Sequence, residues 1–299
     1  MSPGPPLFLV NPASGNGATG KRWPKLRERA AQLGLRGEEV LSEFPGHLGQ
    51  AAREAGDSLL VVVGGDGTVN EVANGVAGTD AEIAVLPCGT GQDFGRTHGV
   101  PSRFDDAVHV ALGGELRTID LGRVELDEGI SRVFANVGSA GMSGAVARRA
   151  NAMTKALGGR TTFFYALTRE FLAWQNTNVL VELDGGVRRE GAMHDVIVAN
   201  GRYHGGGMKL APDARQDDGV FDVVTIGDVN KLDFLTTAPK LYSGRYLSHP
   251  KVELLRSPFV AISSAEPLPL EVDGEPIGTT PARFELVPAA LRLRVPAAA

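Results

Sequence analysis

The sequence contains one cysteine, Cys88, so no disulfide can form within the chain. This is typical of a reducing compartment, where disulfides are rare. No apolar run approaches the length of about 18 residues that a membrane-spanning helix needs. The first residues, MSPGPPLFLVNPASG, lack the basic segment of a signal peptide. We therefore expect a cytoplasmic protein that meets any lipid from the aqueous side.

The chain also lacks an excess of positive charge, since 30 Lys and Arg residues face 35 Asp and Glu residues and the formal net charge is −5. Proteins that hold nucleic acid by charge carry a basic face, so the composition argues against a nucleic-acid partner. It argues equally against strong electrostatic attachment to anionic lipid. The length of 299 residues exceeds what one ordinary core takes, which predicts two domains.

The first half of the chain alternates between short apolar runs and helical patterns. Strands are predicted at Leu7–Val10 and in EEVLSEF, SLLVVV and AEIAVLP. Helices are predicted over residues 19–33, in HLGQAAREAG, over Val69–Val76 and in FDDAVHVALGG. Continuously apolar strands that alternate with helices are typical of a parallel sheet covered on both faces. The sequence therefore predicts a three-layer α/β domain over residues 1–121.

After about Asp120, predicted strands follow one another and are separated by turn signals such as DGG, NGR, DDG and DGE. These strands are Arg123–Glu125, Arg132–Val137, Asn178–Asp184, Asp195–Asn200, Val220–Ile226, Val252–Leu255, Val260–Ser263, Leu268–Asp273 and Phe284–Val287. One helical region is predicted over about Ala145–Gln175, and GSAGMSG (Gly138–Gly144) is interpreted as a strand-to-helix turn. We expect a mostly antiparallel β-sandwich over residues 122–299, and a return of the C-terminal tail to the first domain is left open.

The stretch GGDGT (Gly64–Thr68) ends an apolar strand and precedes a helix. Glycines let backbone N–H groups approach an anion, and a helix N-terminus adds about half a positive charge. No GK[ST] follows, so this is not a Walker A loop, and Asp66 distinguishes it from a GxGxxG turn. An aspartate beside a polyphosphate needs a cation between them, so Asp66 indicates a magnesium nucleotide.

Two further polar glycine turns follow predicted strands. NPASGNG (Asn11–Gly17) follows the first strand, and PCGTGQDFGR (Pro87–Arg96) follows the fourth. Because the carboxyl ends of parallel strands meet at one edge of a sheet, we expect these turns to form one site. The acidic turns DARQDDG and DGE occur later. From the residues alone, solvated surface turns are the favoured interpretation of both.

In this order, the motifs resemble the diacylglycerol kinase catalytic family, which also holds sphingosine kinases and bacterial lipid kinases. The resemblance rests on NPASG, GGDGTVNEVANG and LPCGTGQDFGR, and it continues in GGGMKLAPDARQDDGVFDVV (Gly205–Val224) and LEVDGEP (Leu270–Pro276). GGDGT alone is shared with NAD kinases and phosphofructokinases, so the ordered set carries the specificity. The family implies a NAD kinase-like α/β domain for ATP, a β-sandwich domain for lipid, and an active site between them.

The resemblance implies roles for particular residues. The ATP contacts are Asn11, Pro12, Ala13, Ser14, Gly15, Ser42, Gly64, Gly65, Asp66, Gly67, Thr68, Val69, Asn70, Thr90 and Asp93. A structural magnesium is implied at Asp218 and the backbone carbonyls of Arg215 and Val220, with waters reaching Asp93 and Asp120. The catalytic base is implied at Asp273 or Glu275. Asp66 is a further candidate for the base and the carboxylate closest to a Mg²⁺ that bridges the phosphates.

The implied reaction is transfer of the γ-phosphate of ATP to a hydroxyl of diacylglycerol or a similar lipid at the inner membrane face, where the protein binds peripherally. A homodimer is left open. Gln92 departs from the family pattern GTxND, because glutamine stands where asparagine is usual. Its amide is kept and lengthened by a methylene, so we expect altered packing rather than lost activity.

Three alternatives remain. A NAD kinase should lack NPASG and the VDGE turn, and both are present. A non-catalytic lipid- or nucleotide-binding regulator would be consistent with Gln92. A dinucleotide oxidoreductase predicts GxGxxG after the first strand, where none occurs.

Overall fold

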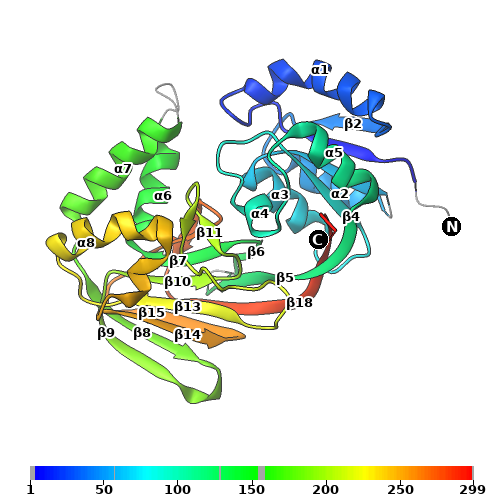
Figure 1. The fold of residues 1–299 in the computed structure, drawn as a ribbon. Helices are drawn as coiled ribbons and strands as arrows, with labels where there is room; N and C mark the ends of the chain where they lie inside the picture. The colour runs from blue at the N-terminus through cyan, green and yellow to red at the C-terminus, as the bar shows by residue number, and fades with distance from the viewer. Residues whose placement is uncertain (1–3, 57, 128, 154–158, 298–299) are drawn as a thin grey trace. The chain divides into compact units, whose positions relative to one another are not determined.

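A computed structural model describes residues 4–56, 58–127, 129–153 and 159–297. The chain divides into two compact units, whose elements are labelled in Figure 1. Unit 1 contains the residues up to Leu121 and those from Pro288 onward, and unit 2 is Gly122–Val287. Strands β5 (Glu115–Leu126) and β18 (Ala282–Val295) contain residues of both units. Within the described residues, the helices are too short or too polar to cross a membrane.

Unit 1 is built on a parallel sheet in the order β2-β1-β3-β4-β18. Its strands are β1 (Leu7–Val10), β2 (Glu38–Leu41), β3 (Leu59–Gly64), β4 (Glu82–Pro87) and the last part of β18. Its helices are α1 (Ala18–Gln32), α2 (His47–Glu54), α3 (Asp66–Val76), α4 (Asp93–Thr97) and α5 (Phe104–Gly113).

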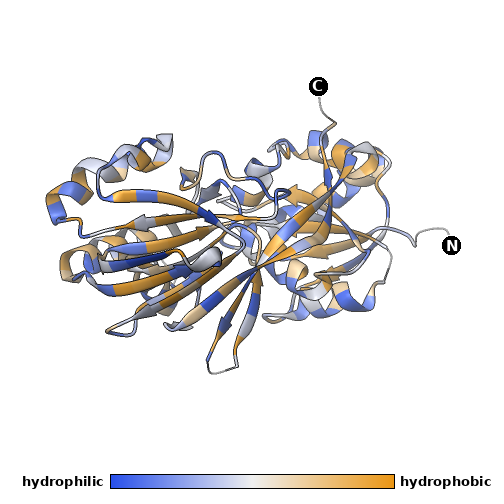
Figure 2. Cartoon of the chain, turned by 90° about the horizontal axis from the view of Figure 1, so that it is seen from below, coloured by the Kyte–Doolittle hydropathy of each residue, from blue (hydrophilic) through white to orange (hydrophobic). Residues whose placement is uncertain are grey.

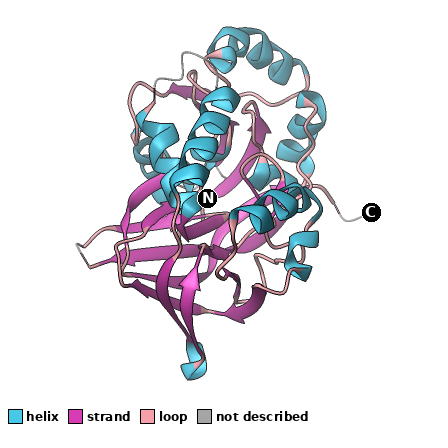
Figure 3. Ribbon diagram, turned by 90° about the vertical axis from the view of Figure 1, so that its left-hand side faces the viewer, coloured by secondary structure: helices cyan, strands magenta, loops and turns pink. Residues whose placement is uncertain are grey.

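Apolar residues on both faces of this sheet explain why helices cover each side. Phe8, Val10, Val61 and Val63 alternate along β1 and β3 and pack with Trp23 of α1 and with α5. The intervening residues are equally buried and face α2 and α3, which pack against each other. Figure 3 shows helices flanking the strands of this unit. Burial on both faces is what a parallel sheet requires.

Unit 2 contains two antiparallel sheets. One joins the first part of β18 to β15 (Phe259–Ser264), β8 (Thr177–Leu183) and β9 (Arg188–Met193), with the hairpin of β5 and β6 (Ser131–Phe134) beside β18. The other has the order β14 (Val252–Ser257), β13 (Phe221–Ile226), β10 (Asp195–Ala199), β7 (Val137–Gly141), β16 (Pro269–Val272) and β17 (Glu275–Thr279). β11 (Tyr203–His204) and β12 (Met208–Lys209) form a short separate hairpin.

The core of unit 2 lies between these two sheets. Phe134, Phe221 and Phe284 cluster there, with ring centroids 5.8 and 6.0 Å apart. Orange, hydrophobic stretches follow the strands in Figure 2. The outer face of the second sheet is covered by α6 (Met142–Ala152) and by the buried Tyr246, and α7 (Gly159–Ala173) packs against α6. The α/β and β-sandwich fold classes predicted from the sequence are confirmed.

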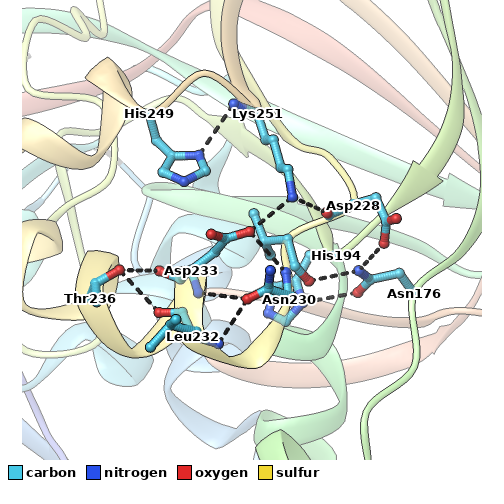
Figure 4. Close-up of polar contacts among 10 residues, drawn as sticks. Asn176, His194, Asp228, Asn230, Leu232, Asp233, Thr236, His249 and Lys251 are labelled. Atoms are coloured by element: carbon cyan, nitrogen blue, oxygen red, sulfur yellow. Dashed lines mark hydrogen bonds and ion pairs between the residues drawn. The ribbon is translucent and has the colours of Figure 1, made fainter.

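Helix α8 (Lys231–Thr237) is held by a polar cluster, shown in Figure 4. Asn230 and Asp233 form a capping box, and Lys251 Nζ donates to Asp233 Oδ2 at 2.8 Å. Asn176 donates to Asp228 Oδ1 at 2.8 Å, and its own oxygen lies 3.0 Å from His194 Nδ1. The short 3-10 helices Ala238–Ser243 and Arg245–Ser248 follow α8. The sequence predicted none of these three helices.

Some local predictions were wrong. GSAGMSG is not mainly a turn, because Gly138–Gly141 belong to β7 and the helix begins at Met142. A Cβ at Gly138 would lie 2.6 Å from the Phe284 ring, so this glycine allows close packing within a strand. The helix after GGDGT begins at Asp66 and not at Val69. Strands β9 and β17 were missed, and part of the predicted helical region, residues 154–158, lies outside the described residues.

Candidate active site

The three glycine turns of unit 1 lie side by side at the carboxyl ends of β1, β3 and β4. Asn11 joins the first turn to the second, because its Nδ2 donates to Thr68 Oγ1 at 3.2 Å. The third turn joins the second through the N–H groups of Cys88 and Gly89, which donate to Gly64 O at 2.8 and 3.0 Å. These contacts bring the three predicted loops together in one place.

Two glycines in these turns leave no room for a Cβ, Gly89 because of the backbone opposite it and Gly64 because of the side chain of Thr68. A Cβ at Gly89 would lie 2.4 Å from the Cα of Gly65, and a Cβ at Gly64 would lie 2.3 Å from Thr68 Oγ1. Only Gly65 separates β3 from α3, so the strand passes directly into the helix. The positive end of the α3 dipole is therefore located at the turns, as phosphate binding requires.

The carboxylates of Asp66 and Asp93 both lie near Gly91. Asp66 Oδ1 accepts a hydrogen bond from the N–H of Phe94 at 2.9 Å. A Cβ at Gly91 would lie 2.6 Å from Asp66 Oδ2 and 3.9 Å from Asp93 Oδ2, so a side chain at this position would crowd the Asp66 carboxylate. Asp93 is buried and paired with Arg96. Carboxylate oxygens are ligands that Mg²⁺ prefers, and an ion here would share the Asp93 carboxylate with Arg96.

The first turn is held by its own side chains. Asn11 Oδ1 accepts from the N–H of Ala13 at 3.0 Å, and Ser14 Oγ lies 2.8 Å from Thr19 Oγ1. Thr19 Oγ1 donates in turn to Cys88 O at 3.0 Å, which ties α1 to the third turn. Pro12 and Gly15 complete this turn, and Gly15 has a φ of 62°.

The remaining predicted nucleotide contacts occupy the same end of the sheet. Ser42 follows β2, and its N–H donates to Val10 O at 2.8 Å. Gly67, Val69 and Asn70 belong to the first turns of α3. Thr90 is exposed in the third turn.

Gln92 has a φ of 58°, a left-handed conformation that asparagine adopts more readily than glutamine. Its Nε2 donates to Gly89 O at 3.0 Å, so the longer amide bonds back to its own turn. Gln92, Gly65 and Asp66 line a hole of only about 10 Å³. A larger hollow of about 380 Å³ on unit 2, lined by Glu182, Arg188 and Arg283 among others, contains none of the predicted site residues.

Asp120 and Asp218 each have a protein partner. Asp120 is buried, and its Oδ1 accepts from the N–H of Ala289 at 2.8 Å, which fixes the returning C-terminal strand within unit 1. Asp218 pairs with the guanidinium of Arg256, and its Oδ1 lies 3.4 Å from the N–H of Val220. Arg215 Nε donates to Asp217 Oδ1 at 3.0 Å.

A metal ion at Asp218 would therefore share that carboxylate with Arg256. Among the residues that the structure describes, no three His, Cys, Asp or Glu side chains are grouped to hold a metal ion. The implied site would depend on the backbone oxygens of Arg215 and Val220.

The VDGE turn holds its aspartate by backbone contacts. Asp273 Oδ2 accepts from the N–H of Ala135 at 2.8 Å, and its Oδ1 accepts from those of Asn136 and Val137 at 2.9 and 3.0 Å. Asp273 has a φ of 48°. Glu275 begins β17 and is exposed. The two predicted acids thus have different environments.

Glu271, two residues before Asp273, was not among the site residues predicted from the sequence. It is 1% exposed, and its Oε2 accepts from the N–H of Gly274 at 2.6 Å. Its Oε1 accepts from Ser139 Oγ at 2.7 Å and lies 3.4 Å from His204 Nε2. Burial raises the pKa of Glu271, and His204 partly opposes this shift. An acidic residue between the apolar Leu270 and Val272 was the sequence signal that could have identified it.

Comparison with known proteins assigns the chain to a family. A model described as the diacylglycerol kinase catalytic domain matches residues 5–124, and one described as the YegS C-terminal NAD kinase beta sandwich-like domain matches residues 136–295. A diacylglycerol kinase of Mycobacterium tuberculosis is 31% identical over 298 residues, covering 96% of this chain and 94% of the relative. A protein of Pseudomonas aeruginosa named as a YegS-like lipid kinase is 34% identical over 254 residues, covering 83% and 80%.

Solved structures support the same fold. A diacylglycerol kinase from Bacillus anthracis has a TM-score of 0.74 at 21% identity, covering 99% of this chain and 98% of that one. An NAD kinase from Archaeoglobus fulgidus in complex with ATP has a TM-score of 0.51 at 14% identity, covering 97% and 93%. These likenesses concern the fold alone. The sequence matches confirm the family resemblance, and the chain belongs to the diacylglycerol kinase catalytic domain family with a YegS-type C-terminal domain.

Proposed function

We propose that this protein is an ATP- and magnesium-dependent kinase that transfers the γ-phosphate of ATP to a hydroxyl of diacylglycerol or a similar lipid. The observation that supports this most is the joining of three glycine turns around Asp66 and Asp93 at one end of the unit 1 sheet. The names of its relatives, diacylglycerol kinase and YegS-like lipid kinase, agree on a lipid acceptor but not on one lipid.

Residues of unit 1 bind and orient the nucleotide in this proposal. The start of α3 and the turn Asn11–Gly15 contact the phosphates, and the contacts Asn11–Thr68 and Gly89–Gly64 hold these turns in register. Asp66 and Asp93, whose carboxylates lie near Gly91, would hold Mg²⁺. The ion, when bound, neutralises the charge that develops on the transferred phosphoryl group.

Residues of unit 2 carry the acceptor chemistry in this proposal. A lipid hydroxyl needs a base as it attacks, and such help contributes roughly 10² to 10⁴ in rate. Three backbone N–H groups already occupy the oxygens of Asp273, so we assign Asp273 to holding the turn and Glu275 to accepting the proton. Residues 1–121 then act as the ATP-binding domain, and 122–299 as the lipid-binding domain with a C-terminal tail that returns to the first.

The proposal places the enzyme in the cytoplasm, acting peripherally at the inner membrane face. Its test is incubation with radiolabelled ATP, Mg²⁺ and vesicles that carry diacylglycerol, monoacylglycerol, ceramide, sphingosine or phosphatidylglycerol, with NAD in a parallel reaction. Label in a lipid, and none after chelation of Mg²⁺, is the expected result. Labelled NAD would identify a NAD kinase, and tight lipid binding without any transfer would identify a regulator.

Variants assign the roles within that assay. Glu275→Gln should lower kcat by roughly 10² to 10⁴ with little change in the KM for ATP. A matched control is Glu182→Gln, on β8 in the same unit, whose partner is the exposed Arg188. Glu275→Gln with full activity would exclude Glu275 as the base.

A further inference from the structure

Four oxygens form a row between Asp195 and Glu271 in unit 2, and all of them except Oγ of the half-buried Ser143 belong to buried residues. Ser139 Oγ lies 2.7 Å from Glu271 Oε1, Ser143 Oγ lies 2.7 Å from Ser139 Oγ, and Asp195 Oδ1 lies 2.8 Å from Ser143 Oγ. The sheet register explains the row, because Ser139 of β7 pairs with Glu271 of β16, and Gly141 of β7 pairs with Asp195 of β10. Asp195 is 6% exposed, and Ser139 and Glu271 are each 1% exposed.

Gly141 allows this approach. It has a φ of 138°, and a Cβ there would lie 2.8 Å from the Cα of Asp195 and 2.9 Å from its Oδ1. The bare glycine lets Asp195 reach the first turn of α6, where the N–H of Ser143 donates to Oδ2 at 2.9 Å. The contact is therefore built into the backbone of β7 and α6.

The hydrogens in this row can be counted. Three short contacts join the four oxygens, and the two serine hydroxyls supply only two hydrogens. If both carboxyl groups were ionised, one contact would bring two acceptors together without a hydrogen, which is costly where three of the four residues are buried. The third hydrogen must therefore belong to a carboxylic acid at one end of the row.

The surroundings of the two ends decide where that hydrogen lies. Glu271 accepts from the Gly274 N–H at 2.6 Å and has His204 Nε2 at 3.4 Å, and both neighbours lower its pKa and so favour a negative charge there. Burial and the nearby Asp273 act in the opposite direction and raise the pKa of Glu271. In the described part of the chain, the ionisable groups shown to interact with Asp195 are Glu271 and Tyr246, and neither is cationic. Burial raises the pKa of Asp195 to about 7.

We propose that Asp195 is held as the neutral acid and orders a one-way chain of hydrogen bonds through Ser143 and Ser139 to an ionised Glu271, which fixes the Asp273–Glu275 turn. Asp195 donates to Ser143, Ser143 donates to Ser139, and Ser139 donates to Glu271, whose other oxygen holds the Gly274 N–H. Asp195 and Glu271 are then positioning residues. This rests on the proposed function only in that the turn supplies the base.

Infrared spectroscopy of the full chain tests where the hydrogen lies. The wild type should show a carboxylic-acid C=O band below neutral pH that is lost as the pH rises through about 7. Asp195→Asn should lack this band. A band of equal size in Asp195→Asn, or no such band in the wild type below neutral pH, would overturn the proposal.

Substitutions that change the hydrogen count test the chain itself. Asp195→Asn keeps a hydrogen-bond donor toward Ser143, whereas Asp195→Leu removes it. The double variant Asp195→Asn with Glu271→Gln places a donor at each end of the row, at positions 195 and 271. The double variant should therefore raise the unfolding equilibrium constant at least about tenfold beyond the product of the single effects. Additive effects in this cycle would contradict the proposal.

The amide resonance of Gly274, observed with isotope-labelled glycine, tests the link to the turn without any assay of activity. Asp195→Asn should keep its chemical shift, and Asp195→Leu should move it. An unmoved Gly274 resonance in a folded Asp195→Leu variant would overturn the positioning role.

In phosphotransfer assays, activity of the wild type should fall above about pH 7, and this fall should be absent in Asp195→Asn. An equal fall in both forms would remove Asp195 from that pH dependence. If no form phosphorylates a lipid while the infrared band and the Gly274 shift behave as expected, the proposed function fails and the hydrogen-bonded chain stands.

Discussion

Asp66 accepts a hydrogen bond from the backbone N–H of Phe94 at 2.9 Å, so the first residue of α3 holds the start of α4. One oxygen of this carboxylate therefore has a structural partner, while the other lies next to Gly91. The same side chain serves both the joining of two turns and the proposed binding of Mg²⁺.

These two roles of Asp66 can be separated by substitution. Asp66→Asn keeps an oxygen for the Phe94 N–H and removes the charge, whereas Asp66→Ala also leaves that N–H without its partner. We expect Asp66→Ala to lose about 1–3 kcal/mol of unfolding free energy and Asp66→Asn much less. Both should lose phosphotransfer activity. Urea unfolding and the labelled-ATP assay measure the two effects.

Asp105→Asn is the matched control for Asp66→Asn. Asp105 lies in the same unit and forms an exposed ion pair with Arg29. This variant should keep full activity. An active Asp66→Asn enzyme would remove Asp66 from the metal site.

Glycine requirements within the motif differ from one position to the next. A Cβ at Gly89 would lie 2.4 Å from the Cα of Gly65, which is backbone and cannot rotate away, whereas Gly67 has nothing within 4 Å. Gly89→Ala should therefore lower the unfolding free energy by about 1–3 kcal/mol. Gly67→Ala, within α3, should be neutral or stabilising by up to about 1 kcal/mol. Equal losses in urea unfolding would contradict this account.

The sequence predicted the turns of unit 1 well because their geometry follows from a general rule. Parallel strands end at one edge, so three polar glycine turns after apolar strands had to meet. Their internal contacts, such as Asn11 Nδ2 with Thr68 Oγ1, depend on atomic distances that no spacing gives. The start of α3 at Asp66 was missed because glycine and aspartate are poor helix formers.

Unit 2 was harder to predict because its glycines and acids have uncommon uses. Gly138 and Gly141 signal a turn by composition, yet they lie in β7 where Phe284 and Asp195 approach the strand. The alternation of polar and apolar residues along β16 predicts that Glu271 faces solvent, but this face of the strand is buried. Helix α8 was missed because its seven residues are too few for a helical period to be recognised.

The guanidinium of Arg256 interacts with both Asp218 and Asp222, and Arg256 Nε lies 3.4 Å from Asp222 Oδ1. Burial raises the pKa of Asp222, and Arg256 opposes that shift. Because the arginine is half exposed, the pair should contribute no more than about 1 kcal/mol.

In Arg256→Gln, we expect a further rise in the pKa of Asp222 and a thermal stability that responds to Mg²⁺ more strongly than that of the wild type. Thermal melts with and without Mg²⁺ measure this. The same Mg²⁺ response in both proteins would show that Arg256 does not compete with an ion at Asp218. Arg188→Gln, which breaks the exposed pair with Glu182 in the same unit, is the matched control.

His194 and Asp195 are neighbours with opposite responses to burial. Burial lowers the pKa of His194 from 6.5 to about 4 and raises that of Asp195 from 3.8 to about 7. Below pH 6.5 the unfolded chain protonates His194 while the folded chain does not, so this residue makes stability fall as the pH falls toward 4. Between pH 7 and 3.8 the folded chain protonates Asp195 while the unfolded chain does not, so this residue makes stability rise as the pH falls.

The two effects oppose each other in the wild type, and single variants should expose each one. His194→Asn keeps a donor toward Asn176 Oδ1 and leaves Asp195 to titrate, so its unfolding free energy relative to wild type should rise as the pH falls from 6.5 to 4. Asp195→Asn lacks the gain in stability that Asp195 gives as the pH falls, so its unfolding free energy relative to wild type should fall over the same interval by about 3 kcal/mol. Denaturant unfolding at several pH values measures both slopes. Parallel curves for the wild type and both variants would show that neither residue changes its protonation on folding.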